Sequence, residues 1–446
     1  MQLAAYKRFL LGLLMVLLAF NFVDRFALGL VLQDIKIDLH LTDTQLGVLS
    51  GIAFALFYSI MGVPIARWAD RGNRVTIISL TTALWSVAVA LCGTVGSFLQ
   101  LLLIRTGVAV GEAGGFAPGL SLITDYFTRS ERPRAVALYT LGGPLSAVVG
   151  YLLAGWLNDL YGWRVMFVLL GLPGLVLAAV ARLSLREPRK AQRAHPVPPG
   201  SSTSPPTLKD LCITLWANAT FRYLLLCMSV LFFFIYGVLQ WQPTFFIRSY
   251  GLTSSQLGFW FAAIYGVGGA LGTYLGGELA TRYAANKERV QLIATALAMI
   301  SCAVLSAGTY LTSNYHLAFA LMSGVSIAQA AINGPLYAMM QTLVPERMRA
   351  ASVALVLLFA NLIGMGLGPL TTGALSDALQ PRVAAEALRY ALLMLAPGYL
   401  LVAALAWRAS KTVARDLATT TNANGSADTP SSPLPSHGRM SHEPAR

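Results

Sequence analysis

The chain has 446 residues, of which 56% are hydrophobic and only 11% are charged, and its mean hydropathy is +0.63. A soluble protein carries about 25% charged residues, so this composition excludes a series of soluble domains and indicates a membrane protein with many spans. The net charge of +13 does not indicate a nucleic-acid partner, because the basic residues lie in short segments between apolar runs, as membrane topology requires.

Twelve apolar runs are long enough to cross a membrane as helices, each of which needs about 20 residues. The first six occupy 8–32, 44–66, 75–96, 98–124, 134–157 and 163–184, and the second six occupy 218–246, 254–280, 289–311, 315–343, 349–376 and 387–409. The first run contains Asp24 and Arg25 and is too long for the apolar core of a signal peptide, so we expect a permanent helix. The expected fold is an all-α membrane protein with two six-helix bundles.

The segments outside these runs set the expected domain boundaries. A stretch rich in Pro and Ser, 196–206, separates the two sets of runs and is typical of a flexible linker, whereas the polar end of the chain is typical of disorder. We expect an N-terminal bundle over 1–190, a cytoplasmic linker over 191–212, a C-terminal bundle over 213–410 and a disordered cytoplasmic tail over 411–446.

The distribution of Lys and Arg predicts the orientation in the membrane. Of the 32 basic residues, 25 lie at the termini, in the linker region or at or near the ends of runs on that side, five lie on the opposite side, and two, Arg25 and Arg105, lie deep inside apolar runs. Positive residues concentrate on the cytoplasmic side of membrane proteins. We therefore expect both termini in the cytoplasm and the chain in a plasma membrane, which in a bacterium is the inner membrane.

Four charged residues lie deep inside apolar runs of the first half, away from the ends of the runs: Asp24, Arg25, Arg105 and Glu112. An ionisable side chain at bilayer depth is costly and normally faces a protein interior or a water-filled path. Arg105 and Glu112 are seven residues apart and project from nearly the same face of a helix. Either acid could pair with either arginine. We favour a relay of protons or another cation over a static ion pair, because protonation of one acid would release an arginine.

The two halves of the chain repeat each other. Thr42-Asp-Thr-Gln-Leu-Gly47 opens the second run, and Thr253-Ser-Ser-Gln-Leu-Gly258 opens the eighth, 211 positions later. Glu131-Arg-Pro-Arg-Ala135 is similar to Glu346-Arg-Met-Arg-Ala350. Parallel repeats about an axis along the membrane normal are typical of transporters whose substrate site lies between two bundles near the middle of the membrane.

The loop after the second run reads Ala66-Arg-Trp-Ala-Asp-Arg-Gly-Asn-Arg74. It resembles the loop signature of the major facilitator superfamily, although two glycines of that signature are replaced. An acid in this loop can cap a helix N-terminus or pair with an arginine, which would hold the cytoplasmic helix ends together in one state. We expect such a conformational latch, rather than only a basic loop, from Asp70, Arg71, Arg74 and Arg134.

Two further motifs, Asn21-Phe-Val-Asp-Arg-Phe26 and Gly107-Val-Ala-Val-Gly-Glu-Ala113, resemble the Spinster-like branch of that superfamily. The resemblance implies twelve transmembrane helices, alternating access and proton coupling through Asp24, Arg25 and Glu112. Eukaryotic members of the branch move lysolipids and sphingoid phosphates. The anion:cation symporter branch, whose members import small organic anions, shares an Asp-Arg in the first helix and a Gly-Glu-Ala in the fourth.

Polar side chains of the second half are candidate substrate contacts. Gln329, Asn333, Tyr337 and Gln341 recur every four residues along the tenth run, so they share one stripe that should face an interior or a cavity. Hydrogen bonding between helices is the alternative role, and the one we favour for Gln341. Pro243 predicts a bend in the seventh run, and bent helices often line a transport path. The expected substrate contacts are Asn21, Tyr236, Gln240, Tyr265, Gln329, Asn333, Tyr337 and Asn361.

Together these features predict a secondary active transporter that moves an amphipathic or anionic organic solute, such as a lysolipid, by proton-coupled alternating access. The expected coupling residues are Asp24, Glu112, Arg25 and Arg105. The alternatives are an organic-anion:cation symporter of the same superfamily and a non-transporting membrane sensor with the same fold. We expect no enzyme activity, no metal site and no cofactor other than the coupling ion, H⁺, and the four cysteines lack ligand spacing. The expected partners are the substrate and membrane lipid, with the chain as a monomer.

Overall fold

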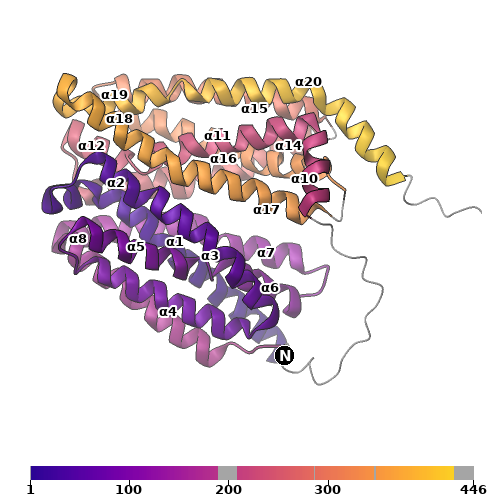
Figure 1. Ribbon diagram of the computed structural model, residues 1–446, viewed down its shortest axis with the longest axis horizontal. Coiled ribbons are helices and arrows are strands. Elements are labelled where there is room, and N and C mark those ends of the chain that lie inside the picture. The colour runs from indigo at the N-terminus through magenta and orange to yellow at the C-terminus, as the bar shows by residue number, and fades with distance from the viewer. Residues whose placement is uncertain (1, 189–207, 286, 346–347, 426–446) are drawn as a thin grey trace, which may run out of the picture.

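The computed structural model describes residues 2–188, 208–285, 287–345 and 348–425. Within these ranges the chain is helical and contains no strand. The helices form two bundles that lie side by side, with most helices along the long axis of the molecule (Figure 1). The expectation of an all-α protein with two bundles is confirmed.

Each bundle is a continuous half of the chain. The N-terminal bundle consists of α1 (Gln2–Leu39), α2 (Asp43–Ser50), α3 (Ile52–Arg71), α4 (Arg74–Cys92), α5 (Phe98–Glu112), α6 (Phe116–Tyr126), α7 (Arg132–Thr140) and α8 (Gly142–Ser184). The C-terminal bundle consists of α10 (Leu208–Ala217), α11 (Ala219–Leu239), α12 (Gln242–Tyr250), α13 (Ser254–Phe261), η1 (Ala262–Gly268), α14 (Gly269–Tyr283), α15 (Glu288–Leu311), α16 (Tyr315–Thr342), α17 (Arg349–Phe359), η3 (Ala360–Leu367), α18 (Gly368–Val383), η4 (Ala384–Glu386), α19 (Ala387–Leu395) and α20 (Gly398–Gly425).

All twelve expected runs are present as helical passes. Eight continuous stretches of the described chain are long and apolar enough to cross a membrane, judged by length and composition. Two of them, Arg134–Ser184 and Ala351–Thr419, have 51 and 69 residues, and each is long enough to cross twice at about 1.5 Å per residue. The other two passes are α5 with α6 and α13 with α14, which are interrupted along their length.

Several passes are broken where polar or small residues lie. The fourth pass is interrupted between the end of α5 at Glu112 and the start of α6 at Phe116. The seventh is interrupted between Leu239 and Gln242, which confirms the bend predicted from Pro243. The eighth and eleventh contain the π-helical segments η1 and η3. Helix interruptions of this kind re-aim side chains and are frequent at functional sites.

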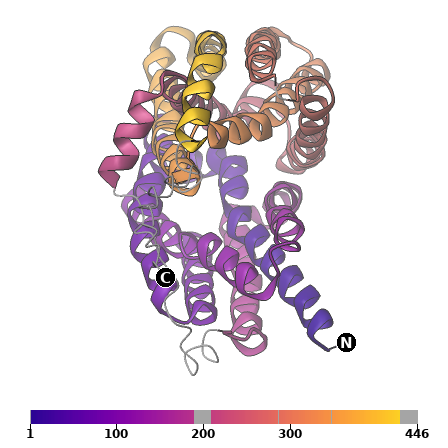
Figure 2. The same ribbon diagram turned by 90° about the vertical axis from the view of Figure 1, so that its right-hand side faces the viewer.

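The two bundles meet mainly at one end of the molecule, which we call the closed end. There α2 packs against α18, and α8 packs against α13 and η1. In Figure 1 the closed end lies on the left, and the N-terminus lies at the opposite end. Figure 2 views the molecule from that opposite end, with the C-terminal bundle above the N-terminal bundle. The closed end therefore contains the main contact between the repeated halves.

Two expected boundaries differ from the structure. α10 begins at Leu208, inside the expected linker 191–212, while 189–207 lie outside the described residues. α20 continues to Gly425, so the first part of the expected disordered tail, 411–446, is helical. The reason is a contact that the tail makes with the bundle: Asp416 accepts hydrogen bonds from the Thr220 N–H at 2.7 Å and hydroxyl at 2.8 Å, and Val413 is buried.

Candidate functional site

Two ion pairs join α1 and α5 inside the N-terminal bundle. Arg105 Nη1 lies 2.6 Å from Asp24 Oδ2, and Arg25 Nε donates to Glu112 Oε2 at 2.7 Å. Asp24 and Arg25 are consecutive, so their side chains point about 100° apart on the helix and reach two different residues of α5. The pairing that the sequence leaves open is therefore Asp24 with Arg105 and Arg25 with Glu112.

Three of these side chains are buried and Arg25 is half-buried, and two of the carboxylate oxygens have no partner. The exposed fraction is 0% for Glu112, 2% for Asp24 and Arg105, and 17% for Arg25. Within the described residues, Asp24 Oδ1 and Glu112 Oε1 accept no hydrogen bond. A buried oxygen without a partner is costly, so each carboxylate is only partly compensated by its arginine.

The break after α5 places Glu112 at the end of a helix. The Gly115 N–H donates to the Glu112 backbone carbonyl at 3.2 Å, and Asn21 Nδ2 lies 3.5 Å from the same oxygen. Asn21 is 3% exposed, and a Cβ at Gly115 would lie 3.4 Å from its amide nitrogen. The structure therefore places Asn21, an expected substrate contact, against the backbone that positions Glu112.

Arg25 also faces a cavity of about 100 Å³ between the bundles, which we call the central cavity. Its guanidinium carbon lies 4.6 Å from the ring centroid of Phe22 and 4.7 Å from that of Phe54. Its Nη1 lies 3.8 Å from Sδ of Met365, which belongs to the C-terminal bundle. Arg105 lines the same cavity. The central cavity thus has cationic groups and aromatic rings in one wall.

A second cavity, of about 180 Å³, lies in the C-terminal bundle, and we call it the C-terminal cavity. Its polar groups are amides and hydroxyls that also bond to one another. Gln242 accepts a hydrogen bond from the Tyr265 hydroxyl and donates to Tyr310 at 3.3 Å, while Gln329 donates to the Tyr399 hydroxyl at 2.9 Å. Leu239 lines both cavities, so they lie on opposite sides of one residue of α11.

The two cavities contain five of the eight expected substrate contacts. Tyr236 and Gln240 line the central cavity, and Tyr265, Gln329 and Asn333 line the C-terminal cavity. Asn21, Tyr337 and Asn361 line neither of these two cavities.

Sequence reasoning missed several residues that line the cavities. Gln242 lies next to the predicted bend and its position beside Pro243 was a usable signal, whereas the Tyr399 position in α20 carries no distinguishing pattern. Tyr151 and Met365 line the central cavity and are ordinary members of apolar runs. Such wall residues become visible only when the neighbours of each helix are known.

The loop signature contributes a buried ion-pair network. Arg74 is fully buried, and its Nη2 lies 2.6 Å from Asp125 Oδ2 and 2.5 Å from Glu187 Oε1. The Arg74 N–H also donates to Glu187 at 2.6 Å. All three residues belong to the N-terminal half of the chain. In this conformation Arg74 therefore joins the start of α4 to the end of α6 and to the segment that follows α8, all within the N-terminal bundle.

The other expected latch residues lie at the same end of the molecule. Arg71 ends α3, Arg134 is exposed on α7, and the side chain of Asp70 lies outside the described residues. Next to them, Glu131 accepts hydrogen bonds from the Thr128 N–H at 2.9 Å and from Lys7 at 3.0 Å. These donors, Thr128 first, lower the pKa of Glu131 from 4.5 to about 2.

Comparison with known proteins agrees with this architecture. The family model of the Major Facilitator Superfamily matches residues 14–369. An MFS-type efflux pump of Mycolicibacterium smegmatis is 31% identical over 414 residues, which cover 91% of this chain and 93% of the pump. A hexuronate transporter of Bacillus subtilis is 25% identical, covering 80% of this chain and 85% of that protein. A crystal structure of a bacterial homologue of the human lysosomal transporter Spinster, in an inward-facing and unoccupied conformation, is 31% identical with a TM-score of 0.81, covering 92% of this chain and 98% of that one.

Proposed function

Since this chain belongs to the Major Facilitator Superfamily and is a Spinster-like transporter, we propose that it moves an amphipathic or anionic organic solute by proton-coupled alternating access. A transporter carries its solute chemically unchanged, so the chain is not an enzyme. The observation that carries the proposal is the buried pair of carboxyl groups, Asp24 and Glu112. Each is ion-paired to an arginine, and each has one oxygen that accepts no hydrogen bond within the described residues.

The coupling step is a proton binding to Glu112. Protonation of Oε1 neutralises the carboxylate, so the attraction that holds Arg25 is lost and the cluster of two acids and two arginines gains a net charge of about +1. Arg25 already lines the central cavity, where an anionic group can then pair with it. Loss of the proton restores the Arg25–Glu112 pair and displaces the anion. In symport the proton and the solute leave on the same side of the membrane, and in exchange they leave on opposite sides.

The walls of the cavities support an amphipathic or anionic solute. Arg25 suits a carboxylate or phosphate, and the rings of Phe22 and Phe54 beside it suit an apolar chain. The C-terminal cavity adds uncharged hydroxyl and amide groups, among them Asn333 and Tyr265. A lysolipid combines an anionic group, hydroxyls and one apolar chain, and is therefore the first solute to test.

We place the closed end on the extracytoplasmic side, with both termini in the cytoplasm. The excess of Lys and Arg on the side of the termini supports this orientation, because positive residues concentrate on the cytoplasmic side. In that orientation the conformation is inward-facing, like that described for the similar Spinster homologue.

A second candidate function is symport of a small organic anion, such as a sugar acid. The relative that favours it is the hexuronate transporter of Bacillus subtilis. The hydroxyl and amide groups of the C-terminal cavity would bond to the hydroxyls of a sugar, and Arg25 would hold its carboxylate. This candidate uses the same coupling step and differs in the absence of an apolar chain on the solute.

The test is the change of internal pH in proteoliposomes when solutes are added one class at a time: lysophospholipids, sphingoid bases, sugar acids and aromatic acids. We expect one class to drive a proton flux that Asp24→Asn and Glu112→Gln abolish and the exposed control Glu278→Gln leaves unchanged. The active class decides between the two candidates, and replacing Na⁺ by choline tests the coupling ion. Solute uptake without proton movement, unchanged in Asp24→Asn and Glu112→Gln, would overturn the coupling mechanism. No flux for any solute would favour a sensor.

A further inference from the structure

The closed end is built from two helix crossings that repeat each other. In the first, α2 of the N-terminal bundle crosses α18 of the C-terminal bundle, and in the second, α13 of the C-terminal bundle crosses α8 of the N-terminal bundle. α2 and α13 both begin with a capping box, formed by Thr42 with Gln45 and by Thr253 with Gln256. The repeated sequence that opens these helices therefore makes the same local structure in both halves, and each copy lies against the opposite half.

In the first crossing the two backbones touch at glycines. A Cβ at Gly47 would lie 2.6 Å from the Pro369 carbonyl oxygen, and a Cβ at Gly373 would lie 2.3 Å from the Asp43 carbonyl oxygen. Both distances are shorter than real Cβ atoms allow. Side chains larger than hydrogen are therefore excluded from these positions when the bundles are in contact here.

The second crossing has the same arrangement. A Cβ at Gly258 would lie 2.4 Å from the Tyr151 carbonyl oxygen, and a Cβ at Gly155 would lie 2.4 Å from the Ser254 carbonyl oxygen. Gly258 follows Gly47 by 211 positions, and Gly155 precedes Gly373 by 218 positions. The two crossings are thus related by the repeat of the chain.

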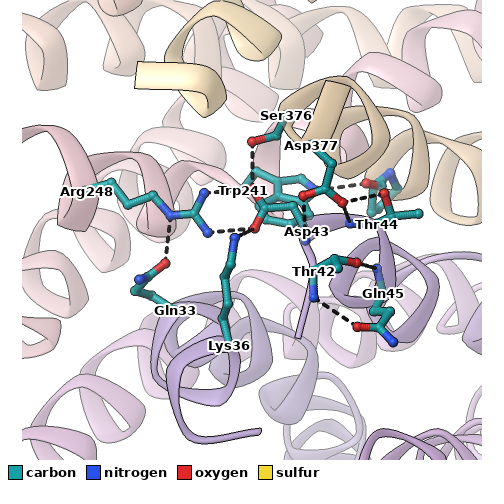
Figure 3. Close-up of polar contacts among 11 residues, drawn as sticks. Gln33, Lys36, Thr42, Asp43, Thr44, Gln45, Trp241, Arg248, Ser376 and Asp377 are labelled. Atoms are coloured by element: carbon teal, nitrogen blue, oxygen red, sulfur yellow. Dashed lines mark hydrogen bonds and ion pairs between the residues drawn. The ribbon is translucent and has the colours of Figure 1, made fainter. Parts of the chain in front are cut away.

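At each crossing a carboxylate from one half caps a helix of the other half. Asp377 on α18 accepts hydrogen bonds from the Asp43 N–H at 3.0 Å, the Thr44 N–H at 2.7 Å and the Thr44 hydroxyl at 2.6 Å (Figure 3). The two N–H groups are backbone donors of the first turn of α2, which have no partner inside their own helix. The negative charge of Asp377 also lies at the positive end of the helix dipole.

Asp159 on α8 makes the corresponding contact in the second crossing. It accepts hydrogen bonds from the Ser254 N–H at 3.1 Å and the Ser255 N–H at 2.8 Å, at the start of α13. Asp159 ends the sequence Gly155-Trp-Leu-Asn-Asp159, and Asp377 ends Gly373-Ala-Leu-Ser-Asp377. A glycine for backbone contact and an aspartate four residues later are therefore repeated together.

From this arrangement we infer that Asp159 and Asp377 are positioning residues of the transport cycle, because each caps a helix of the opposite bundle and the two caps together hold the closed end shut. Alternating access requires the bundles to part at this end, so both caps must break in the same step and re-form when the end closes. The inference rests on the alternating access of the proposed function. Within the described residues, neither Asp159 nor Asp377 contacts the cluster formed by Asp24, Arg25, Arg105 and Glu112. Their role is therefore separate from that of Asp24 and Glu112.

Among the residues that the structure describes, a charged contact between the bundles strengthens the first crossing alone. Arg248 of the C-terminal bundle donates to both oxygens of Asp43, at 2.8 and 2.7 Å, and Lys36 lies 2.6 Å from the same carboxylate (Figure 3). In the second crossing the residue that corresponds to Asp43 is Ser254, which bonds to Asn158 at 2.9 Å. Asp377 is also half-buried, whereas Asp159 is exposed, so water can replace Asp159 more easily. We therefore expect the cap at Asp377 to contribute more to closure.

The direct test measures the distance between the bundles at the closed end. Spin labels are attached to cysteines at the exposed positions Ile37 and Leu311, after the native cysteines are replaced by Ala, and the distances are recorded by electron–electron double resonance in nanodiscs. We expect Asp377→Asn to raise the ratio of the longer to the shorter distance about tenfold and Asp159→Asn to raise it less. Glu278→Gln, a carboxylate at the opposite end, should leave the ratio unchanged. An unchanged ratio in both cap variants would overturn the inference.

A second test asks whether the closed end must open during transport. Cysteines at positions 44 and 377 replace side chains that touch each other, so oxidation should join the bundles across the first crossing. We expect oxidation to stop solute flux and a reductant to restore it. Full cross-linking with unchanged flux would overturn the inference. The distance measurement needs neither a known solute nor a proton flux, so failure of the proposed coupling mechanism would not affect it.

Discussion

Arg25 approaches one oxygen of Glu112 with two of its nitrogens: Nε donates to Oε2 at 2.7 Å, and Nη2 lies 2.5 Å from the same oxygen without making a hydrogen bond. A planar guanidinium can do this, whereas a lysine ammonium is a single point of charge. Arg105 contacts Asp24 through Nη1 alone. The ion pairs Arg25–Glu112 and Arg105–Asp24 therefore depend to different degrees on the shape of the cation.

The first prediction compares Lys substitutions at the two arginines. Arg25→Lys is expected to lower the rate of solute-driven proton flux about tenfold. This corresponds to a loss of about 1.4 kcal/mol in the interaction between residue 25 and Glu112. Arg105→Lys should lower it less, since a lysine can reproduce a single contact with Asp24. Initial rates in proteoliposomes with an internal pH dye check this. Equal losses of flux rate in Arg25→Lys and Arg105→Lys would show that the approach of two Arg25 nitrogens to Glu112 does not make Arg25 the more sensitive position.

The second prediction concerns the small residues of α5. A Cβ at Gly111 would lie 2.6 Å from the Trp85 backbone nitrogen, while a Cβ at Gly107, one turn earlier, would lie 3.7 Å from the Ala88 Cβ. Overpacking costs about 1–3 kcal/mol, so Gly111→Ala should lower the free energy of unfolding by that amount and lower the melting temperature in detergent. Gly107→Ala is the matched control and should melt within a few degrees of the wild type. A Gly111→Ala protein as stable as the control would show that α4 and α5 can move apart at no cost.

The sequence was sufficient to find the cluster of two acids and two arginines in the N-terminal bundle, but not its pairing. Asp24, Arg25, Arg105 and Glu112 are visible because charges inside apolar runs are rare. Spacing along α5 places Arg105 and Glu112 on one face, but it does not set the rotation of α1 relative to α5. That rotation decides that Asp24 contacts Arg105, and it depends on packing between helices that are distant in the sequence.

Errors in the other predictions have the same origin. The composition of residues 411–425 indicates disorder, yet α20 continues there because Asp416 bonds to Thr220, 196 positions away. The stripe along α16 correctly predicts that Gln329 and Asn333 line a cavity, whereas Tyr337, one turn further, lies outside it. A stripe of polar residues indicates which face of a helix points toward a cavity. How far the cavity extends along that face depends on the packing of the neighbouring helices.

The third prediction separates solute binding from coupling. Asn333 lines the C-terminal cavity, and its Oδ1 accepts no hydrogen bond within the described residues, so it is free to accept one from a solute. Losing a neutral hydrogen bond costs about 1 kcal/mol, so Asn333→Ala should raise the KM for the solute about fivefold. Protons carried per solute molecule should not change. Tyr337→Phe, on the same stripe but outside the cavity, is the control and should leave KM unchanged. A similar rise in KM for Tyr337→Phe would argue that substitutions in α16 affect solute binding through the packing of the helix and not through a direct contact from Asn333.

The fourth prediction is a pH dependence of stability at Glu131. Its pKa is lowered from 4.5 to about 2 in the folded chain, first by the Thr128 N–H and then by Lys7. The folded state therefore binds the proton more weakly than the unfolded state, and the stabilisation is present above pH 4.5 and is lost as pH falls toward 2. The wild type should melt slightly above Glu131→Gln at pH 7, and the difference should shrink as the pH is lowered through 4.5. A difference that is constant between pH 7 and pH 3 would exclude titration of Glu131 as its cause.

The last prediction concerns Arg74, which the loop signature marks as part of a latch and the structure places in a buried network with Asp125 and Glu187. Removing one partner of a buried ion pair leaves an uncompensated charge and costs about 3–5 kcal/mol. Arg74→Met should therefore lower the free energy of unfolding by that amount, while Arg134→Met, at an exposed position of α7, should change it by less than about 0.5 kcal/mol. Thermal unfolding in detergent measures both.

Adding Glu187→Gln to Arg74→Met should restore part of the loss, because the amide removes one of the unpaired charges. If Arg74→Met instead melts normally but has lost transport, the role of Arg74 lies in the conformational cycle, as the loop signature predicts, and not in holding its own bundle together.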